Sequence, residues 1–349
     1  LVERLGGSYR FLHDRVQEAA YALVPESERS REHLRIGRLL VAHTPPDRCE
    51  ETIFEIVNQL NRGAALMTSP AEREQLSRLN LIAGKRAKAS AAHAAALDYF
   101  TSGARLLPDD AWKGRSELTF ALELNRAECQ FVTGDLASAE ERLSIVAERV
   151  TNLVDEGSVA CLRIALYTVL RRWDRAIEIG LAYLTKVGIA WSPHPTAEEV
   201  REEHERLWQQ LGSRPIESLF DLPAMSDPET RLTIDVLSEL QGCSHWMDQN
   251  LEHLLLLRMA NLSMQHGNTD ASTVAYAYLG LVVGVRFGQY AAAYRFGLLA
   301  IDLVDRKGLD RARTRVYWGV GAWVVPWVRH LREARPVLRR SLQSCENWR

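Results

Sequence analysis

Two stretches carry residue types that could do chemistry, and each lacks the rest of the pattern that its chemistry needs. Gly84-Lys85 is the only Gly-Lys pair, but Arg86 follows it. A phosphate-binding loop also needs a glycine five positions before the Gly-Lys pair and a hydroxyl after it, and neither is present. His204 stands among three glutamates at 202–205, but adjacent residues on a helix point to different faces. That stretch predicts a solvated charged helix.

Other catalytic signatures are missing as well. The sequence has no protein-kinase motif set, no strand-bounded GxGxxG and no HExxH zinc motif. We therefore expect no catalytic residue, no cofactor and no metal in this chain, which is then not an enzyme by itself.

Composition narrows the possible partners. The 349 residues are 46% apolar and 25% charged, with a formal net charge of −2, so nothing draws the chain toward nucleic acid or anionic lipid. No apolar run is long enough to span a bilayer. Five scattered cysteines without a CxxC pair are typical of reduced thiols in a cytoplasmic protein. We expect cytoplasmic localisation and protein partners. Because the first residue is Leu1, we also expect a piece of a longer protein.

The elements that would position any site come from a loose repeat. A turn is followed by a small residue that opens an amphipathic segment, clearest at Gly134-Asp-Leu-Ala-Ser-Ala139. The same small residue recurs in four more copies, at Ala96, Ala176, Ala293 and Ala334. Such offsets are typical of tetratricopeptide-like helix-turn-helix repeats. The pattern predicts an all-α fold, a right-handed solenoid of helical hairpins with almost no strand.

The repeats and the breaks between them divide the chain into four segments. Residues 1–70 are expected to form a small helical, winged-helix-like segment whose first helix covers 8–24. Repeats are expected over 71–190 and again over 229–349. Between them, 191–228 should be an insertion, with a charged helix at 197–211 and a proline-bearing extended loop at 213–228.

Several residue strings resemble one protein family. They are Tyr9-Arg-Phe-Leu-His-Asp-Arg-Val-Gln-Glu-Ala-Ala-Tyr21, Ile36-Gly-Arg-Leu-Leu40, Phe54-Glu-Ile-Val-Asn-Gln-Leu-Asn-Arg-Gly63 and Leu79-Asn-Leu-Ile-Ala-Gly84. Together they resemble the helical region that follows the AAA/STAND-type ATPase domain in large bacterial multi-sensor hybrid histidine kinases and serine/threonine kinases.

That resemblance implies a function without chemistry of its own. The chain would be a signalling scaffold that couples an upstream ATPase to downstream sensor and histidine-kinase modules, with ATP and Mg²⁺ bound elsewhere in the parent protein. The alternative is the inducer- or partner-binding repeat region of a STAND-type transcriptional regulator. The resemblance also implies a nucleotide-sensing role for His13 and Arg15, and the alternative for this pair is local bonding at a helix start.

The repeat register also predicts a partner-binding face. Positions 2, 5, 9 and 12 of each first helix point into the concave side of a tetratricopeptide-like stack. The candidates are Arg78, Leu81, Lys85 and Lys88 in the first repeat, then Leu124, Glu128, Phe131 and Tyr278, with Val282 and Val285 beyond. We expect this face to bind an acidic helix or loop, from the same polypeptide or a dimer mate. The alternative is that the lysines are only a solvated surface.

Overall fold

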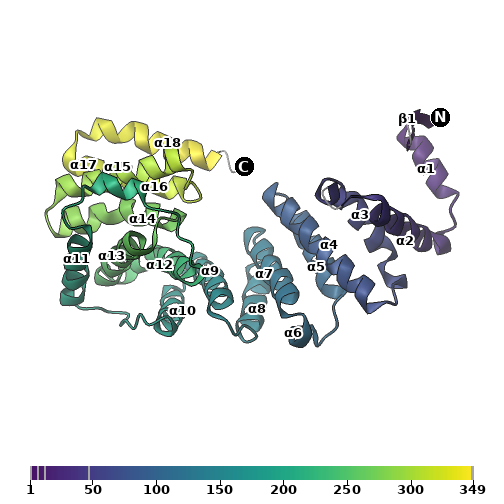
Figure 1. The fold of residues 1–349 in the computed structure, drawn as a ribbon, viewed down its shortest axis with the longest axis horizontal. Coiled ribbons are helices and arrows are strands. Elements are labelled where there is room, and N and C mark those ends of the chain that lie inside the picture. Colours follow the sequence, from purple (N-terminus) through teal and green to yellow (C-terminus); the bar gives the residue numbers. More distant parts are fainter. Residues whose placement is uncertain (1, 6–7, 12, 46–47, 347–349) are drawn as a thin grey trace. The chain divides into compact units, whose positions relative to one another are not determined.

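The computed structural model describes residues 2–5, 8–11, 13–45 and 48–346. Its backbone contacts divide the chain into two compact units, Leu1–Arg149 (unit 1) and Val150–Arg349 (unit 2). Both are built from helices, apart from one short hairpin near the N-terminus (Figure 1). The predicted all-α class is therefore confirmed. The boundary between the units falls inside the predicted first repeat segment, 71–190.

The hairpin corrects the predicted first helix. Strand β1 (Val2–Leu5) pairs antiparallel with β2 (Ser8–Phe11), and the helix α1 begins only at Asp14. Valine, tyrosine and phenylalanine favour strands, so the residue types of this stretch suit a pair of strands. The helix-like spacing of apolar residues from position 8 was therefore misleading.

Unit 1 consists of successive helical pairs. Its elements after α1 (Asp14–Ala22) are α2 (Glu26–His43), α3 (Cys49–Gly63), the 3₁₀ turn η2 (Ala64–Leu66), α4 (Pro70–Ala89), α5 (His93–Arg105), α6 (Ala111–Gly114), α7 (Ser116–Val132) and α8 (Leu136–Ala147). The extensive contacts join α2 to α3, α4 to α5 and α7 to α8, and α5 packs on the following α7.

Unit 2 adds further pairs and one extra helix. Its elements are α9 (Leu153–Val169), α10 (Trp173–Lys186), α11 (Ala197–Leu211), η3 (Ile216–Asp221), α12 (Pro228–Met247), α13 (Gln249–His266), α14 (Asp270–Leu279), the π-helical η4 (Gly280–Arg286), α15 (Tyr290–Lys307), α16 (Arg313–Trp323), α17 (Val325–Val328), η5 (Leu331–Glu333) and α18 (Ala334–Glu346). The predicted charged helix has the bounds of α11. The loop predicted after it contains the 3₁₀ helix η3.

The repeat turns share one backbone geometry. Ala91, Gly134, Arg171 and Gly288 have φ between +56° and +88°, and each stands five residues before a buried marker alanine. In the first three turns, the residue after the one with positive φ donates its backbone N–H to the carbonyl five residues earlier in the chain. The donors are Ala92, Asp135 and Arg172, and each bond is 2.9 Å long. This bond closes the end of the first helix and starts the return helix.

Small residues let the helices of a pair approach closely. A Cβ added at Gly84 of α4 would lie 2.3 Å from the ring of Phe100 in α5, so the ring occupies the space that the glycine leaves. Phe100 and the marker Ala96 are fully buried. The two helices of this pair therefore cross closely at Gly84 and Phe100.

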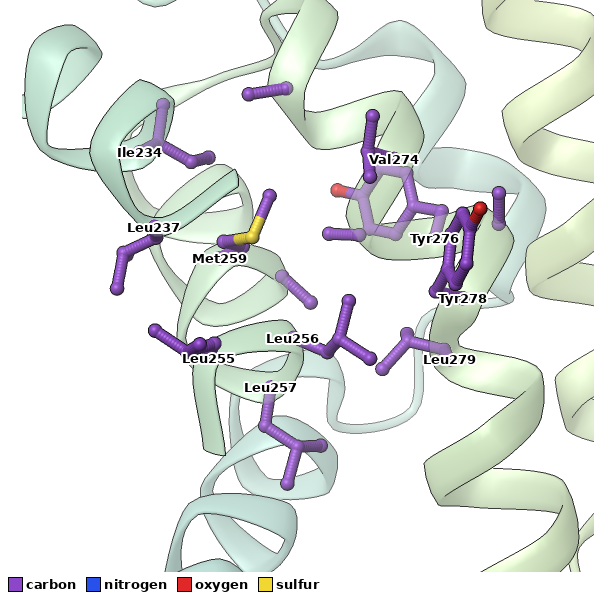
Figure 2. Close-up of a cluster of buried hydrophobic side chains, with 14 of the residues drawn as sticks. Ile234, Leu237, Leu255, Leu256, Leu257, Met259, Val274, Tyr276, Tyr278 and Leu279 are labelled. Carbon is purple, nitrogen blue, oxygen red and sulfur yellow. The ribbon is translucent and has the colours of Figure 1, made fainter. Parts of the chain in front are cut away.

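The core differs in extent between the units. Unit 1 buries its apolar side chains in two small clusters, one around Ile53 and Leu76 and one around Phe100 and Leu122. Unit 2 has one continuous cluster that runs from α9 to α18. Figure 2 shows its middle, where Leu256 of α13 points toward Leu279 of α14 and Leu255 points to the side of Leu237 of α12.

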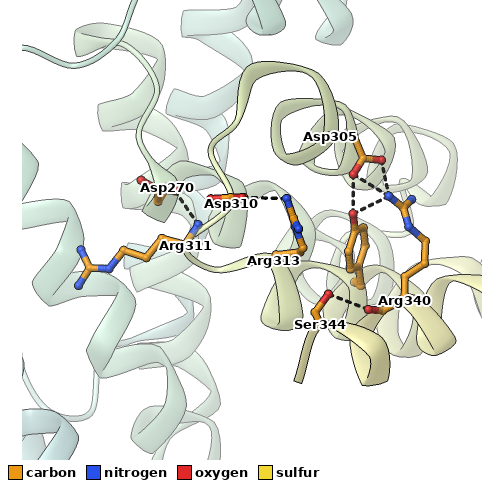
Figure 3. Close-up of polar contacts among 8 residues, drawn as sticks. Asp270, Asp305, Asp310, Arg311, Arg313, Arg340 and Ser344 are labelled. Atoms are coloured by element: carbon orange, nitrogen blue, oxygen red, sulfur yellow. Dashed lines mark hydrogen bonds and ion pairs between the residues drawn. The ribbon is translucent and has the colours of Figure 1, made fainter. Parts of the chain in front are cut away.

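Polar contacts fasten the last helices of unit 2 (Figure 3). Asp305 of α15 accepts bonds from the Tyr317 hydroxyl of α16 at 2.5 Å and from the Arg340 guanidinium of α18 at 2.6 Å. Burial, and then the Asp305 carboxylate, raise the pKa of Tyr317 to about 12. None of the described helices is both long and apolar enough to cross a membrane.

Candidate partner-binding surface

The four candidates of the first repeat lie on α4 of unit 1. Ser69 caps this helix by accepting from the Glu72 N–H, and Pro70 occupies its first turn. Arg78 and Lys85 are exposed, whereas Leu81 and Lys88 are half-buried. The helix therefore exposes two basic side chains to solvent and partly covers the other two candidates.

Lys88 is held by the next first helix. Its ammonium lies 2.7 Å from a Glu128 carboxylate oxygen and 2.7 Å from the Asn125 side-chain oxygen, both on α7. Three-quarters of the Lys88 side chain is covered. Two of the predicted candidates, Lys88 and Glu128, are thus brought together, and the charge of Lys88 is balanced within the chain.

The other basic residues of α4 differ in how they are engaged. Arg78 donates to Glu74 at 2.9 Å, and Glu74 also binds Arg115. These two arginine partners lower the pKa of the Glu74 carboxyl, Arg115 more than Arg78. The Arg86 guanidinium lies 5.4 Å from the centre of the Phe54 ring. Lys85 is the candidate for which the described part of the chain shows no ion pair.

On α7 the predicted apolar side chains, Leu124 and Phe131, are half-buried and in reach of solvent. Sequence spacing did not reveal that Glu128 between them holds Lys88, because the helix crossing that joins α4 to α7 is a tertiary feature. The surface over α4 and α7 is consequently mixed in charge, and the described part of the chain shows no ion pair for the exposed Lys85.

Tyr278 does not line an open surface, which corrects that prediction. It belongs to unit 2 and is 8% exposed, and Val282 is fully buried. A Cβ added at Gly319 of α16 would lie 2.6 Å from the Tyr278 ring, so the glycine makes room for it. Helix α16 therefore covers the face of α14 that the repeat register left open. Val285, in η4, is 40% exposed.

His13 and Arg15 lie at the start of α1, and both are exposed. Their proposed nucleotide-sensing role stays a prediction.

The acidic stretch at 202–205 is not a fully solvated face. Glu203 and His204 are 4% and 7% exposed. Glu203 accepts from Arg206 at 2.6 Å and from the Asn261 amide at 2.8 Å. The His204 ring stacks on Phe287 with centroids 3.7 Å apart, and burial lowers its pKa. These side chains fasten α11 to its neighbours, and the described residues contain no cluster of three or more metal-ligating groups.

The comparisons with known proteins give one relative. The chain is 24% identical to "Hybrid signal transduction histidine kinase G" of Dictyostelium discoideum, in an alignment that covers 97% of this chain and 11% of that protein. The chain thus spans about a ninth of the length of the relative it matches. No family profile and no solved structure matches the chain. At this distance the match relates the chain to signal-transduction proteins.

Proposed function

We propose that this chain is a non-catalytic scaffold of a multidomain sensor kinase. It would be a tetratricopeptide-like, right-handed helical solenoid that couples an upstream AAA/STAND-type ATPase to downstream sensor and histidine-kinase modules in the cytoplasm. The observation that carries the proposal is the match of nearly the whole chain to a short part of a hybrid histidine kinase. The repeated turns at Ala91, Gly134, Arg171 and Gly288 support the repeat architecture.

The helical packing supports the coupling role in physical terms. Within each unit a helix contacts its pair mate and the first helix of the next pair, as α5 does with α4 and α7. Packed side chains resist compression, so a displacement of one pair moves the next. Such transmission needs no catalytic group and no bound ATP or Mg²⁺ in this chain, since those belong to the proposed ATPase module.

The segment roles follow from the same proposal. Residues 1–70 would be the lid or winged-helix-like end of the ATPase module, where His13 and Arg15 sense nucleotide. The repeats at 71–190 and 229–349 would bind protein segments of the same polypeptide or a dimer mate, and 191–228 would be an insertion. Neither nucleic acid nor membrane is a partner in this proposal.

Lys85 gives the sharpest test of the proposed basic docking face. Because Lys88 already pairs with Glu128, Lys88→Glu would place two carboxylates together and disturb the fold as well as binding. Lys85→Glu changes an exposed charge alone. We expect Lys85→Glu to slow association with an acidic segment and to weaken its salt dependence. Lys113→Glu, another exposed lysine of unit 1, is the matched control. Equal association rates for the two variants would contradict this docking face.

The coupling role is tested in the parent protein. The proposal requires its reading frame to encode an ATPase before this chain and sensor and histidine-kinase modules after it. A DNA-binding output domain in their place would favour the transcriptional regulator. Replacing 150–349 by a flexible linker should then leave kinase autophosphorylation intact while removing its response to the state of the ATPase. A response that survives this replacement would refute the coupling role.

A further inference from the structure

A groove of about 460 Å³ opens on unit 2 beside α10. One wall is the outer face of α10, the other is the loop 191–194, and Met247 at the end of α12 closes one side. Its apolar lining includes Ile177, Leu181 and Trp191. This volume lies in the range of about 300–1,000 Å³ that binding pockets occupy.

The loop wall is fixed by contacts on several sides. The Asn250 amide donates to the Pro195 carbonyl at 2.9 Å, and the His194 ring lies 2.9 Å from an Asp248 carboxylate oxygen. The Arg258 guanidinium lies 5.6 Å from the centre of the Trp191 ring. Because Asp248 and Asn250 flank the start of α13, the loop is tied to that helix. The groove is thus formed before any partner arrives.

An aromatic pair, Trp173 and Trp246, adjoins the groove. Trp246 is 68% exposed and stacks on Trp173, with ring centroids 6.2 Å apart. Each tryptophan is the sequence neighbour of a groove residue, Trp246 of Met247 and Trp173 of Asp174. Trp173 is half-buried and supports the exposed Trp246 ring. An exposed tryptophan beside an apolar groove is typical of the residues that dominate binding energy at protein interfaces.

The charges of the groove define the partner. Its lining carries Asp174 and Glu178 and neither lysine nor arginine. Glu178 is paired with Arg175, whereas Asp174 has no ion pair in the described part of the chain. Asp174 is thus the acidic group that remains for a partner. An acidic side chain beside the apolar lining complements a partner segment in which a basic side chain adjoins an apolar one.

We propose that this groove and the Trp173–Trp246 pair dock a segment of a partner protein in which a leucine-like or aromatic side chain adjoins a lysine or arginine. The apolar side chain would lie on Leu181, Trp191 and Met247, and the basic group would reach Asp174. The open shape and its extension to two tryptophans suit a chain segment more than a compact metabolite. The inference rests on the proposed scaffold role and gives it a second surface, on unit 2.

The test uses the whole chain and three short synthetic peptides. One alternates leucine and lysine on an amphipathic pattern, the second replaces lysine by glutamate, and the third replaces leucine by serine. We expect the leucine–lysine peptide to bind most tightly, and each replacement to weaken binding at least about tenfold, as measured by isothermal titration calorimetry. Failure of that peptide to bind, or equal binding of the glutamate peptide, would overturn the proposal.

Variants locate the binding. Ala182 is exposed and lines the groove, so Ala182→Arg fills it and adds a positive charge, and Asp174→Lys reverses its acidic group. Both should weaken binding of the leucine–lysine peptide about tenfold or more. Ala137→Arg, at an exposed alanine of α8 in unit 1, is the matched control and should bind like wild type. Unchanged affinity in both groove variants would overturn the proposal.

A second copy of the chain is a distinct outcome. If wild type dimerises in sedimentation analysis and Ala182→Arg is monomeric, the groove binds its own chain, and the proposed partner is wrong. The peptide measurements use this chain alone, so they do not depend on an ATPase or kinase module. If the peptide binds but coupling in the parent kinase is unaffected by the linker replacement, the scaffold role fails while the groove remains a binding site.

Discussion

Unit 1 buries its apolar side chains in two separate clusters, whereas unit 2 buries them in one cluster from α9 to α18. Both units use glycine where helices meet within a pair and between pairs. In unit 1, Gly84 of a first helix receives Phe100 of its own pair mate, and Gly103 of α5 receives Leu122 of the next pair. In unit 2, Gly157 of α9 receives Tyr183 of its own pair mate, and Gly180 of α10 receives Leu240 of α12, which belongs to the next pair. The same turn geometry thus builds both a unit with two core clusters and a unit with one continuous core.

This contrast predicts different cooperativity. Side chains that share one core lose their contacts together, whereas separate core clusters can open one at a time. We expect unit 2 to unfold in one transition and unit 1 to open in smaller steps. The helix α11, fastened to α13 through Glu203 and Asn261, adds a further layer to unit 2.

The largest expected effect comes from removing a buried ring in each unit. Phe100 and Phe296 are both fully buried, and Phe→Ala at either position should cost about 3–5 kcal/mol. Hydrogen exchange followed by mass spectrometry should show Phe100→Ala loosening only the pairs around α4, α5 and α7. Phe296→Ala should raise exchange throughout unit 2. If both variants loosen only their own pair, the cores do not differ as described.

Lowering the pH should reduce the stability of unit 2 through His253, whose side chain is buried and only 3% exposed. The Arg286 guanidinium lies 3.0 Å from its Nδ1, and burial, then the charges of Arg286 and His245, lower the His253 pKa from 6.5 to about 4. Between these values the unfolded state binds more protons than the folded state, so stability falls as pH falls. The expected loss is about 3 kcal/mol from pH 7 to pH 4.

Urea denaturation of unit 2 at a series of pH values measures this effect. The His253→Gln variant keeps a polar side chain without the titration. Whatever its free energy of unfolding at pH 7, that free energy should change less steeply between about pH 6.5 and about pH 4 than in wild type. Identical slopes would show that His253 does not carry the acid sensitivity.

A third test adds volume at a marker alanine. Ala139 is fully buried in α8, so Ala139→Leu should overpack the crossing and cost about 1–3 kcal/mol. The control is Ala137→Leu on the exposed face of the same helix, where the change should stay within about 0.5 kcal/mol. Equal denaturation midpoints for the two variants would refute the assigned repeat register.

The smallest effects belong to the turns that the two units share. Ala91 and Arg171 adopt positive φ without being glycine, a conformation that strains residues with a Cβ. Ala91→Gly and Arg171→Gly should each stabilise the chain by about 0.5–1 kcal/mol, and Gly134→Ala should destabilise it by about 1 kcal/mol. Thermal unfolding of the three variants checks the signs. Destabilisation by both glycine substitutions would argue against a common turn geometry.

The sequence predicted the helices well because their signals are local. Apolar periodicity and the cap at Thr196, whose hydroxyl accepts from the Glu199 N–H, give α11 its predicted bounds. The predicted start of the first helix was wrong because the apolar residues at Tyr9 and Phe11 fit a helical spacing and are also residue types that favour strands. There the pairing partner, which lies earlier in the chain, decides the outcome.

The candidate surface was less accessible to sequence reasoning because it depends on contacts between distant segments. The repeat positions placed the candidate residues on helices α4 and α7. They did not reveal that Glu128 of α7 forms an ion pair with Lys88 of α4. Tyr278 was placed on an open face because no local signal shows that Gly319, 41 residues later, admits its ring. The groove beside α10 was missed for the same reason, since α10, the loop 191–194 and α12 form it together.

We propose that this chain acts through its helical surfaces and performs no chemistry. Phosphate release from ATP and Mg²⁺ by the purified chain measures this most directly, together with transfer of labelled phosphate to protein. The account predicts release at the rate of a protein-free blank and no labelled protein. ATP turnover that survives repurification of the chain and changes in a point variant such as Lys85→Met would contradict it.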